Sequence, residues 1–458
     1  MSINHESYHP GETIAAVATP PGEGGVAIIR ISGKTARQVA DRVFSGPVFS
    51  YSTHTAHYGQ IVDEAGNRVD DVLLLVMLGK RSYVGEETVE IHCHGGSVVT
   101  RQVLDTVLRA GARMARPGEF TFRALMNGNI DLAQAEAVQE LIAAKNEWAL
   151  EAAKHQLQGR LSQKIHSFQQ ELTELAAIFE AWVDFPEEGL AFATEEEVCR
   201  KLEEVCRQMQ QLLDTYHDGK IVSEGISLCL VGTPNVGKSS LMNALLNKDR
   251  AIVTPLPGTT RDILEDHLRL NGLQFRLMDT AGIRERAALI EQEGIRRSKQ
   301  AIEEADVILL VLDVSRKDWE EDKQLIEQVP KGKTIAVWNK IDLPHDGVPT
   351  LGFAHTVSVS AKQKQGLEGL HHAIDRTVWK SGPPSREEIL ITNVRHREAL
   401  VEAIDASRHV IGGLRNNLSP ELIAIDIRQS LSALGKIIGT DVTEDILSSI
   451  FSTFCIGK

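Results

Sequence analysis

The segment ISLCLVGTPNVGKSSLMNALL, at residues 226–246, decides the fold of the central part of the chain. An apolar run predicts a strand, a glycine-rich loop follows it, and SSLMNALL predicts a helix. In the loop pattern GxxxxGK[ST], backbone N–H groups surround phosphate oxygens, Lys238 reaches the β- and γ-phosphates, and the Ser239 hydroxyl is suited to Mg²⁺. With both flanking elements in the required order, we interpret this segment as a P-loop rather than an ordinary glycine-rich turn.

Further strands and loops continue this pattern downstream. The apolar runs FRLMD, VILLVLD and TIAVW alternate with helical segments up to residue 379, which predicts a parallel sheet with helices on both faces. Asp279 and Gly282 of DTAG are placed to meet Mg²⁺ and the γ-phosphate. In NKID, the Asp342 carboxylate can accept two hydrogen bonds from guanine that adenine cannot offer. With the loop Ser360-Ala361-Lys362, these motifs predict a Ras-like GTPase domain and exclude an ATPase.

Two departures from the Ras pattern bear on hydrolysis. Ile283 occupies the position where Ras-type switches carry a water-orienting Gln, and an aliphatic side chain cannot orient water. Either the domain hydrolyses GTP poorly, or another polar group orients the water, and the residues alone leave Glu285, Glu291 and Glu293 open for that role. Asn235 within the P-loop either faces the cations around the phosphates or only stabilises a turn.

Composition limits the remaining possibilities. The 458 residues carry 49 basic and 63 acidic side chains, a net charge of −14, so any contact with RNA requires a local basic patch. Five cysteines without a CxxC pair argue against a disulfide framework. No segment reads as a signal peptide or membrane span. We therefore expect a cytoplasmic protein that does not contact membranes.

The rest of the chain divides by pattern into three parts. Residues 1–125 mix short apolar runs with turns and one helix, which predicts a small α+β domain. Residues 126–217 carry apolar side chains at spacings of three and four, and helical patterns return at 381–458. We predict one discontinuous helical bundle, into which the GTPase domain of residues 218–380 is inserted.

Five further stretches identify a family. They are TPPGEGGVAIIRISG at 19–33, HCHGG at 92–96, ARPGEFTFRALMNGNIDLAQAEA at 115–137, PGTTRD at 257–262 and FCIGK at 454–458. Together with the P-loop, they make the chain similar to the MnmE (TrmE) family of tRNA-modification GTPases along essentially its whole length. The resemblance implies a homodimer joined through the amino-terminal domain, which would bind 5-formyl- or methylene-tetrahydrofolate. With an MnmG-type partner that carries FAD, the protein would modify carbon 5 of the wobble uridine of certain tRNAs.

The resemblance also assigns residues around the nucleotide. It implies K⁺ ligands at the side chains of Asn235 and Thr259 and at the backbones of Thr254 and Leu256. It further implies Mg²⁺ at Ser239 and Thr260, and water orientation by Glu291. The expected GTP contacts are Asn235, Val236, Gly237, Lys238, Ser239, Ser240, Thr254, Pro255, Leu256, Pro257, Gly258, Thr259, Thr260, Asp279, Thr280, Ala281, Gly282, Asn339, Lys340, Asp342, Ser360, Ala361 and Lys362.

A folate site is implied at Arg30, Glu90, Lys458 and position 129, where Asn129 replaces the basic residue expected in the family. From the residues alone, an ordinary charge on an edge strand is the favoured interpretation of Arg30. Loss of the charge at position 129 removes one folate contact, although the remaining basic groups suffice for a glutamyl carboxylate.

The cysteine near the carboxyl end has two interpretations. Cys455 follows an apolar helical pattern, which favours a buried helix-end cysteine. The resemblance instead implies a catalytic role in the modification chemistry, with Lys458 lowering its pKa if close. His92 and His94 point to one face of a strand and Cys93 to the other, which argues against a shared zinc ion.

A regulatory GTPase of ribosome assembly is the alternative function, because it would share the same nucleotide-binding domain. Such factors often append an RNA-binding module with a basic GxxG loop, and none is evident after residue 380. The amino-terminal segment and the FCIGK tail favour the tRNA-modifying enzyme.

Overall fold

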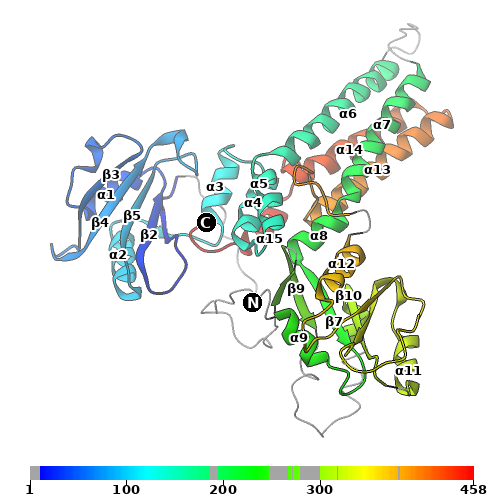
Figure 1. Ribbon diagram of the computed structural model, residues 1–458. Helices are drawn as coiled ribbons and strands as arrows, with labels where there is room; N and C mark the ends of the chain where they lie inside the picture. Colours follow the sequence, from blue (N-terminus) through cyan, green and yellow to red (C-terminus); the bar gives the residue numbers. More distant parts are fainter. Residues whose placement is uncertain are drawn as a thin grey trace. The chain divides into compact units, whose positions relative to one another are not determined.

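The computed structural model describes residues 11–184, 194–246, 267–270, 272–278, 300–316, 318–379 and 382–458. It has the predicted fold class: an amino-terminal α+β domain, helical segments, and an α/β domain between them in the sequence (Figure 1). By contacts, the chain forms two compact units. One comprises Met1–Gln139, Gln156–Val205 and Glu402–Lys458, and the other comprises Glu140–His155 and Cys206–Val401. The domain boundaries predicted near residues 125, 217 and 380 stay predictions.

The amino-terminal domain is built on one mixed sheet in the strand order β3-β4-β5-β2-β1-β6. Its strands are β1 (Ile14–Val17), β2 (Gly24–Ser32), β3 (Thr55–Val62), β4 (Arg68–Met77), β5 (Thr88–Gly95) and β6 (Arg113–Met114). Its helices are α1 (Ala36–Val43), α2 (Ser97–Arg109) and α3 (Glu119–Met126), with 3₁₀ turns at Val48–Ser50 and Gly79–Arg81. The structure confirms the small α+β domain predicted from the sequence, but it has three helices where the sequence pattern indicated one.

The two faces of this sheet differ in chemistry because successive side chains alternate between them. Ile29, Ile31 and Ile91 are fully buried in the same core cluster as apolar residues of α1 and α2. The intervening positions point to the opposite face, where Arg30 of β2 lies directly across from Glu90 of β5. The candidate folate residues on these strands therefore lie on the face away from the main core.

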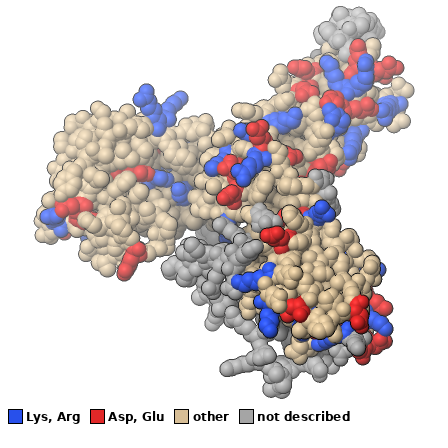
Figure 2. All heavy atoms as spheres, in the orientation of Figure 1, with Lys and Arg blue, Asp and Glu red and all other residues tan. Residues whose placement is uncertain are grey.

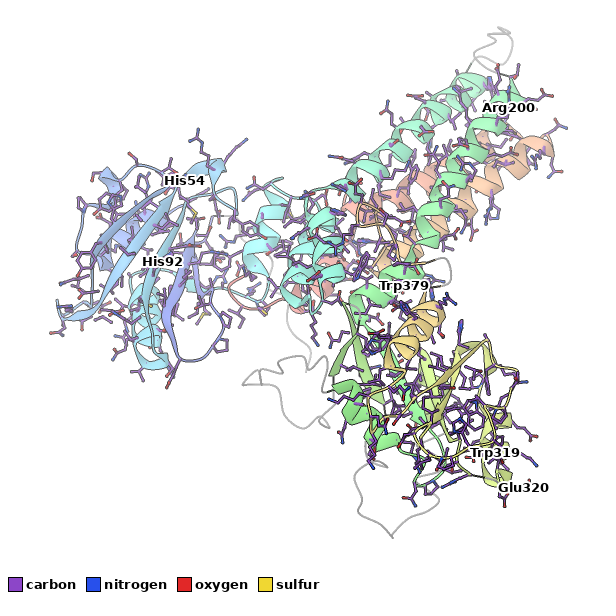
Figure 3. All side chains as sticks on the ribbon, in the orientation of Figure 1. His54, His92, Arg200, Trp319, Glu320 and Trp379 are labelled. Carbon is purple, nitrogen blue, oxygen red and sulfur yellow. The ribbon has the colours of Figure 1, made fainter. Side chains whose placement is uncertain are left out.

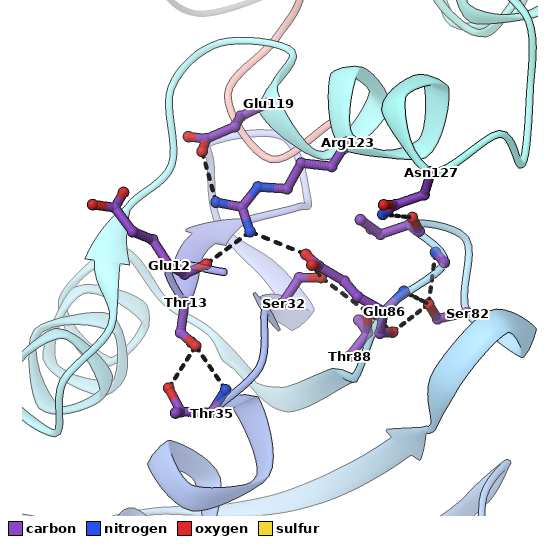
Figure 4. Close-up of polar contacts among 12 residues, drawn as sticks. Glu12, Thr13, Ser32, Thr35, Ser82, Glu86, Thr88, Glu119, Arg123 and Asn127 are labelled. Atoms are coloured by element: carbon purple, nitrogen blue, oxygen red, sulfur yellow. Dashed lines mark hydrogen bonds and ion pairs between the residues drawn. The ribbon is translucent and has the colours of Figure 1, made fainter. Parts of the chain in front are cut away.

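A buried arginine holds α3 against the sheet (Figure 4). Arg123 is fully buried, and its guanidinium donates to Glu119 Oε1 at 2.9 Å, Glu86 Oε1 at 3.0 Å and the Glu12 carbonyl at 2.8 Å. Burial raises the pKa of Glu119, but hydrogen bonds from Arg113 and the Arg116 N–H, with the charges of Arg123 and Arg113, outweigh it and leave that pKa below its ordinary value. The network ties the helix to the segments just before β1 and β5, the second of which is the strand that carries Glu90.

The helical segments are α4 (Leu132–Ala143), α5 (Glu147–Leu157), α6 (Arg160–Asp184), α7 (Glu195–Asp214), α8 (Tyr216–Glu224), α13 (Val394–Arg415), α14 (Pro420–Ile438) and α15 (Glu444–Ser452). The apolar residues predicted to recur at spacings of three and four from Leu157 to Phe179 form a buried stripe along α6, except that Leu157 is the half-buried last residue of α5. The buried positions of α6 are Leu161, Ile165, Phe168, Leu172, Leu175 and Phe179. Helix α14 packs along α6. Figure 2 shows acidic and basic side chains interspersed over α6 and α7, so neither positive nor negative charge dominates these helices on the face drawn.

The α/β domain contains a second sheet, in the order β12-β11-β10-β7-β9-β8, with all strands parallel except β8. Its strands are β7 (Ile226–Val231), β8 (His267–Leu270), β9 (Leu273–Met278), β10 (Val307–Asp313), β11 (Thr334–Asn339) and β12 (His355–Ser358). Helices α9 (Lys238–Leu246), α11 (Glu320–Gln328) and α12 (Leu367–Val378) and the 3₁₀ turn Lys331–Lys333 complete its described elements. Apolar clusters on both faces bury β7, β10 and β11, as predicted.

Helix α5 begins inside the unit of the α/β domain. The Asn146 side chain donates to the Val222 carbonyl at 3.0 Å and accepts the Ala149 N–H at 2.7 Å. Trp148 packs near Trp379, with ring centroids 6.4 Å apart, against the core of the second sheet. None of the described helices is both long and apolar enough to cross a bilayer.

Replacing Arg123 with Met should strongly destabilise α3, because it leaves the Glu119 and Glu86 carboxylates without their buried partner. We expect a local loss of about 3–5 kcal/mol, measured as faster hydrogen–deuterium exchange of the amides in residues 119–126. Arg101→Met is the control, since that side chain is 83% exposed in its pair with Asp105. Equal exchange in both variants would contradict a structural role for Arg123.

Candidate functional site

Two glycines shape the loop between β7 and α9. A Cβ at Gly232 would lie 2.4 Å from the Val311 carbonyl oxygen, and one at Gly237 would lie 2.2 Å from Asn339 Nδ2. Gly237 also has a φ of +97°, in the region that favours glycine. The backbone of this loop therefore approaches β10 and β11 more closely than any side chain would allow, which leaves its N–H groups to form a phosphate cradle.

Two cations lie against this loop. Lys238 Nζ donates to the carbonyls of Gly232 at 2.7 Å and Thr233 at 2.9 Å, and burial, followed by the charge of Arg316, lowers the pKa of Lys238. The Arg316 guanidinium donates to Thr233 Oγ1 at 3.0 Å and to the Pro234 carbonyl at 2.7 Å. The arrangement concentrates positive charge where anionic phosphates are expected.

The Asn339 side chain hydrogen-bonds to two loops, the P-loop and the Ser360-Ala361-Lys362 loop, instead of pointing to solvent. Its Nδ2 donates to the Val236 carbonyl at 2.9 Å, and its Oδ1 accepts the Ala361 N–H at 3.1 Å. The side chain is buried. The P-loop and the Ser360-Ala361-Lys362 loop are thus fixed to each other through one residue of NKID.

Lys340 and Asp342 occupy the open side of this arrangement. Lys340 Nζ donates to the Asn235 carbonyl at 2.8 Å and to Asp313 Oδ2 at 2.6 Å. Ser360 Oγ donates to Asp342 Oδ1 at 2.6 Å, which orients the carboxylate, and no described residue donates to Asp342 Oδ2. The geometry brings the P-loop, NKID and Ser360-Ala361-Lys362 into one site, with a half-buried carboxylate available for hydrogen-bond donors of a base.

Sequence reasoning missed Arg316 and Asp313. Burial raises the pKa of Asp313, but hydrogen bonds from Lys340 and Ser315 outweigh it and leave that pKa low. Asp313 ends the parallel strand β10, and polar residues at the carboxyl ends of such strands are a usable signal for a binding site. Arg316 follows in a turn, and no motif marks it.

Several predicted contacts lie outside the described residues. They are Thr254, Pro255, Leu256, Pro257, Gly258, Thr259, Thr260, Asp279, Thr280, Ala281, Gly282 and Glu291. Of the implied cation ligands, the structure describes Asn235 and Ser239, both exposed at the P-loop. It also describes the predicted GTP contact Ser240, which is exposed beside Ser239. The Asn235 side chain makes no hydrogen bond to another described residue, and its φ is +64°.

A second cluster forms where the chain end meets the first sheet. Arg30 Nε donates to Glu90 Oε1 at 2.8 Å, and Arg30 Nη1 donates to the Gly457 carbonyl at 3.3 Å. The interpretation of Arg30 as an edge-strand charge is wrong, because β2 pairs with β5 on one side and β1 on the other. Its guanidinium also lies over the Phe120 ring, 5.6 Å from the centroid.

Lys458 and Cys455 join this cluster. Burial, and then the charge of Arg30, lower the pKa of Lys458, while Glu90 and Cys455 act in the opposite direction. The expectation of a buried helix-end cysteine is wrong: α15 ends at Ser452, and Cys455 is exposed. The buried positions at this end are taken by Phe451 and Phe454 instead.

Asn129 has a structural role near the same cluster. Its Nδ2 donates to the carbonyls of Ser82 and Tyr83, both at 3.1 Å. Burial raises the pKa of Tyr83, against its hydrogen bond to Thr121 and the nearby charge of Arg30. Asn129 therefore holds the segment that places Tyr83 beside Arg30, although it carries no charge of its own.

The three residues of HCH separate as predicted. His92, labelled on the first sheet in Figure 3, has its Nε2 3.5 Å from Glu90 Oε2, whereas His94 Nδ1 lies 2.7 Å from Asp70 Oδ1. Cys93 points into the core on the other face, where its Sγ donates to the Ala27 carbonyl at 3.5 Å. Burial and the charge of Asp70 raise the pKa of Cys93, which makes it an inert core thiol.

Comparisons with known proteins bear on both sites. A model of the GTP-binding protein TrmE N-terminus matches residues 13–129, and a model of the MnmE helical domain matches residues 132–455. The chain is 65% identical, over 100% of both chains, to the tRNA modification GTPase MnmE of Protochlamydia amoebophila. It is 42% identical to the protein of that name from Alkaliphilus oremlandii, covering 98% of this chain and 99% of the relative. The solved FeoB G-domain from Methanococcus jannaschii matches 33% of this chain and 97% of its own at 27% identity, with a TM-score of 0.25.

The Asp342→Asn substitution should change the preferred base of the bound nucleotide from guanine to xanthine. A carboxylate accepts two hydrogen bonds, whereas the Asn amide accepts one and donates one, which complements the 2-oxo group of xanthine. We expect GTP affinity to fall by about 100-fold or more and xanthosine triphosphate to bind better than GTP, measured by titration with fluorescent nucleotides. Asp346→Asn, an exposed carboxylate four residues on, should change neither affinity. Unchanged GTP binding by Asp342→Asn would exclude this carboxylate from base recognition.

Proposed function

The chain belongs to the MnmE family of tRNA modification GTPases, and from this premise we propose that it hydrolyses GTP to drive a one-carbon modification at carbon 5 of the wobble uridine of certain tRNAs. The single observation that carries the nucleotide part is Asn339, which fixes the P-loop and the Ser360 loop around one site that Asp342 completes. The match over the whole chain favours this function over a ribosome-assembly switch.

GTP and its cations suit the described residues. Lys238 and the P-loop N–H groups would hold the phosphates, and Asp342 would hold the guanine. Ser239, with Thr260, would hold Mg²⁺, and Glu291 would orient the attacking water. The Asn235 side chain, to which no described residue is hydrogen-bonded, supports a K⁺ site shared with Thr254, Leu256 and Thr259. K⁺ would supply positive charge near the transferring phosphate, and pairing of two GTPase domains would enclose it.

A reduced folate suits the cluster at the chain end. Arg30 and Lys458 offer two cations for glutamyl carboxylates, and Glu90 offers a carboxylate for the donors of a pteridine ring. When bound, 5-formyl- or methylene-tetrahydrofolate supplies the one-carbon unit. Cys455 is exposed within the electrostatic reach of Lys458, which supports a role as a nucleophile in the transfer. Asn129 would maintain the backbone conformation beside the site without contributing a charge.

The protein would work as a homodimer through its amino-terminal domain, with an MnmG-type protein carrying FAD and with tRNA as the shared substrate. GTP hydrolysis would change the GTPase domains, and the change would reach the helical segments. This assembly would act in the cytoplasm.

Reconstitution tests the modification. We expect the full-length protein, an MnmG-type FAD partner, tRNA, GTP and methylene-tetrahydrofolate with a ¹³C-labelled one-carbon unit to place the label on the wobble uridine, read by mass spectrometry of nucleosides. Cys455→Ser should abolish labelling while leaving GTP turnover intact. Cys199→Ser is the control, because Cys199 is a half-buried thiol on α7. Full labelling by Cys455→Ser would remove the proposed nucleophile.

Potassium dependence tests the hydrolytic mechanism. GTP turnover of the full-length protein should be at least about tenfold faster in K⁺ than in Na⁺ at equal ionic strength, and Asn235→Ala should lose this difference. Asn417→Ala is a matched control, since Asn417 also has a positive φ, of 53°, but lies in the turn between α13 and α14. Equal slow rates of the unmodified protein in both salts would refute the K⁺ mechanism.

A further inference from the structure

His92 of β5 carries a polar atom without a partner. Its Nε2 is buried and makes no hydrogen bond within the described part of the chain, although the ring as a whole is 30% exposed. Glu90 Oε2 lies 3.5 Å away, beyond the usual range of an N–H···O hydrogen bond. Because buried polar groups are nearly always paired, the simplest explanation is a partner that is not among the described residues, such as a ligand.

The neighbouring strands offer no such partner. In the sheet register, Ile28 of β2 and Leu73 of β4 lie directly opposite His92, and both are apolar. Along β5 itself, the next residue on the same face towards the start of the strand is Glu90. The residues directly opposite His92 in the sheet therefore offer Nε2 no hydrogen-bond partner, and Glu90 is the polar neighbour on its face.

The second histidine of this face provides a contrast. His94 lies two residues along β5, but its backbone N–H donates to Asp70 Oδ2 at 2.8 Å and its ring Nδ1 lies 2.7 Å from Asp70 Oδ1. Its side chain is largely exposed. Within the described residues, His94 is thus satisfied by the protein and His92 is not.

We propose that His92 Nε2–H donates a hydrogen bond to the 4-oxo group of the pteridine ring of a reduced folate, beside Glu90, and this inference rests on the folate site proposed above. One edge of a 2-amino-4-oxo pteridine presents a carbonyl oxygen, a ring N–H and an amino group in succession. An ionised carboxylate only accepts hydrogen bonds, so Glu90 serves the two donors. The carbonyl at the end of that edge needs a donor, which His92 supplies.

The assignment makes His92 a specificity-determining residue. A 4-amino-4-deoxy analogue of the same reduced folate replaces the carbonyl acceptor with an amino donor. Facing such a ligand, His92 Nε2–H would meet another donor, and both groups would stay unpaired. The protein should therefore prefer the 4-oxo folate, and His92 should account for a measurable part of that preference.

The test measures binding of 5-formyltetrahydrofolate and its 4-amino-4-deoxy analogue to the full-length protein by calorimetry. His92→Leu should weaken binding of the 4-oxo ligand by about 5- to 10-fold and reduce the preference over the analogue by the same factor. His92→Gln, whose amide also donates, should retain part of both. His94→Leu should match the unmodified protein. An unchanged circular dichroism spectrum and melting temperature in every variant verify that the amino-terminal domain has folded.

The outcomes separate the two proposals. If the unmodified protein binds neither ligand, the folate site itself fails. If it binds the 4-oxo folate and His92→Leu binds it equally well with the same preference, the folate site stands and the role of His92 is refuted. Equal losses in His92→Leu and His94→Leu would also overturn the assignment, because they would indicate a general disturbance of β5.

Discussion

The close approach of Gly457 to the backbone of β1 is the constraint on which the amino-terminal cluster depends. Gly457 has a φ of +96°, and a Cβ there would lie 2.2 Å from the Val17 carbonyl oxygen. No other residue type fits this conformation and this space without strain. With Gly457 in this conformation, its carbonyl accepts a hydrogen bond from Arg30, and the charges of Arg30, Glu90 and Cys455 act on Lys458. The cluster is thus assembled from the two ends of the sequence.

The features that could be predicted from the sequence are those that depend only on residues close together in the chain. The P-loop is a strand, a loop and a helix in succession, so its pattern survives in one short segment. The apolar spacing of α6 records one buried stripe, and the structure buries it. The alternation of His92 and Cys93 likewise follows from the geometry of a strand alone.

The parts that sequence could not predict depend on contacts between distant segments. Arg30 is interior because β2 pairs with both β1 and β5, and a strand's own residues do not record its neighbours. Cys455 is exposed because the last helix ends before it and the tail turns to meet Gly118, whose N–H donates to the Cys455 carbonyl. Arg316 reaches the P-loop from the turn after β10, and Asp313 at the end of β10 pairs with Lys340 of NKID, both from outside any recognised motif. In each case the missing information is a partner remote in sequence.

The boundaries between the two compact units do not fall in loops. The chain passes between the units four times, and every passage lies inside a helix: α4, α5, α7 or α13. Sequence reasoning places domain boundaries at breaks between patterns, because exposed linkers commonly separate domains. Helix α5 belongs to both units, since Asn146 just before it donates to the Val222 carbonyl in one unit and Gln156 near its end donates to the Ala133 carbonyl in the other. A unit boundary inside a helix leaves the helical pattern unbroken, so the residues on either side of it could not mark it in the sequence.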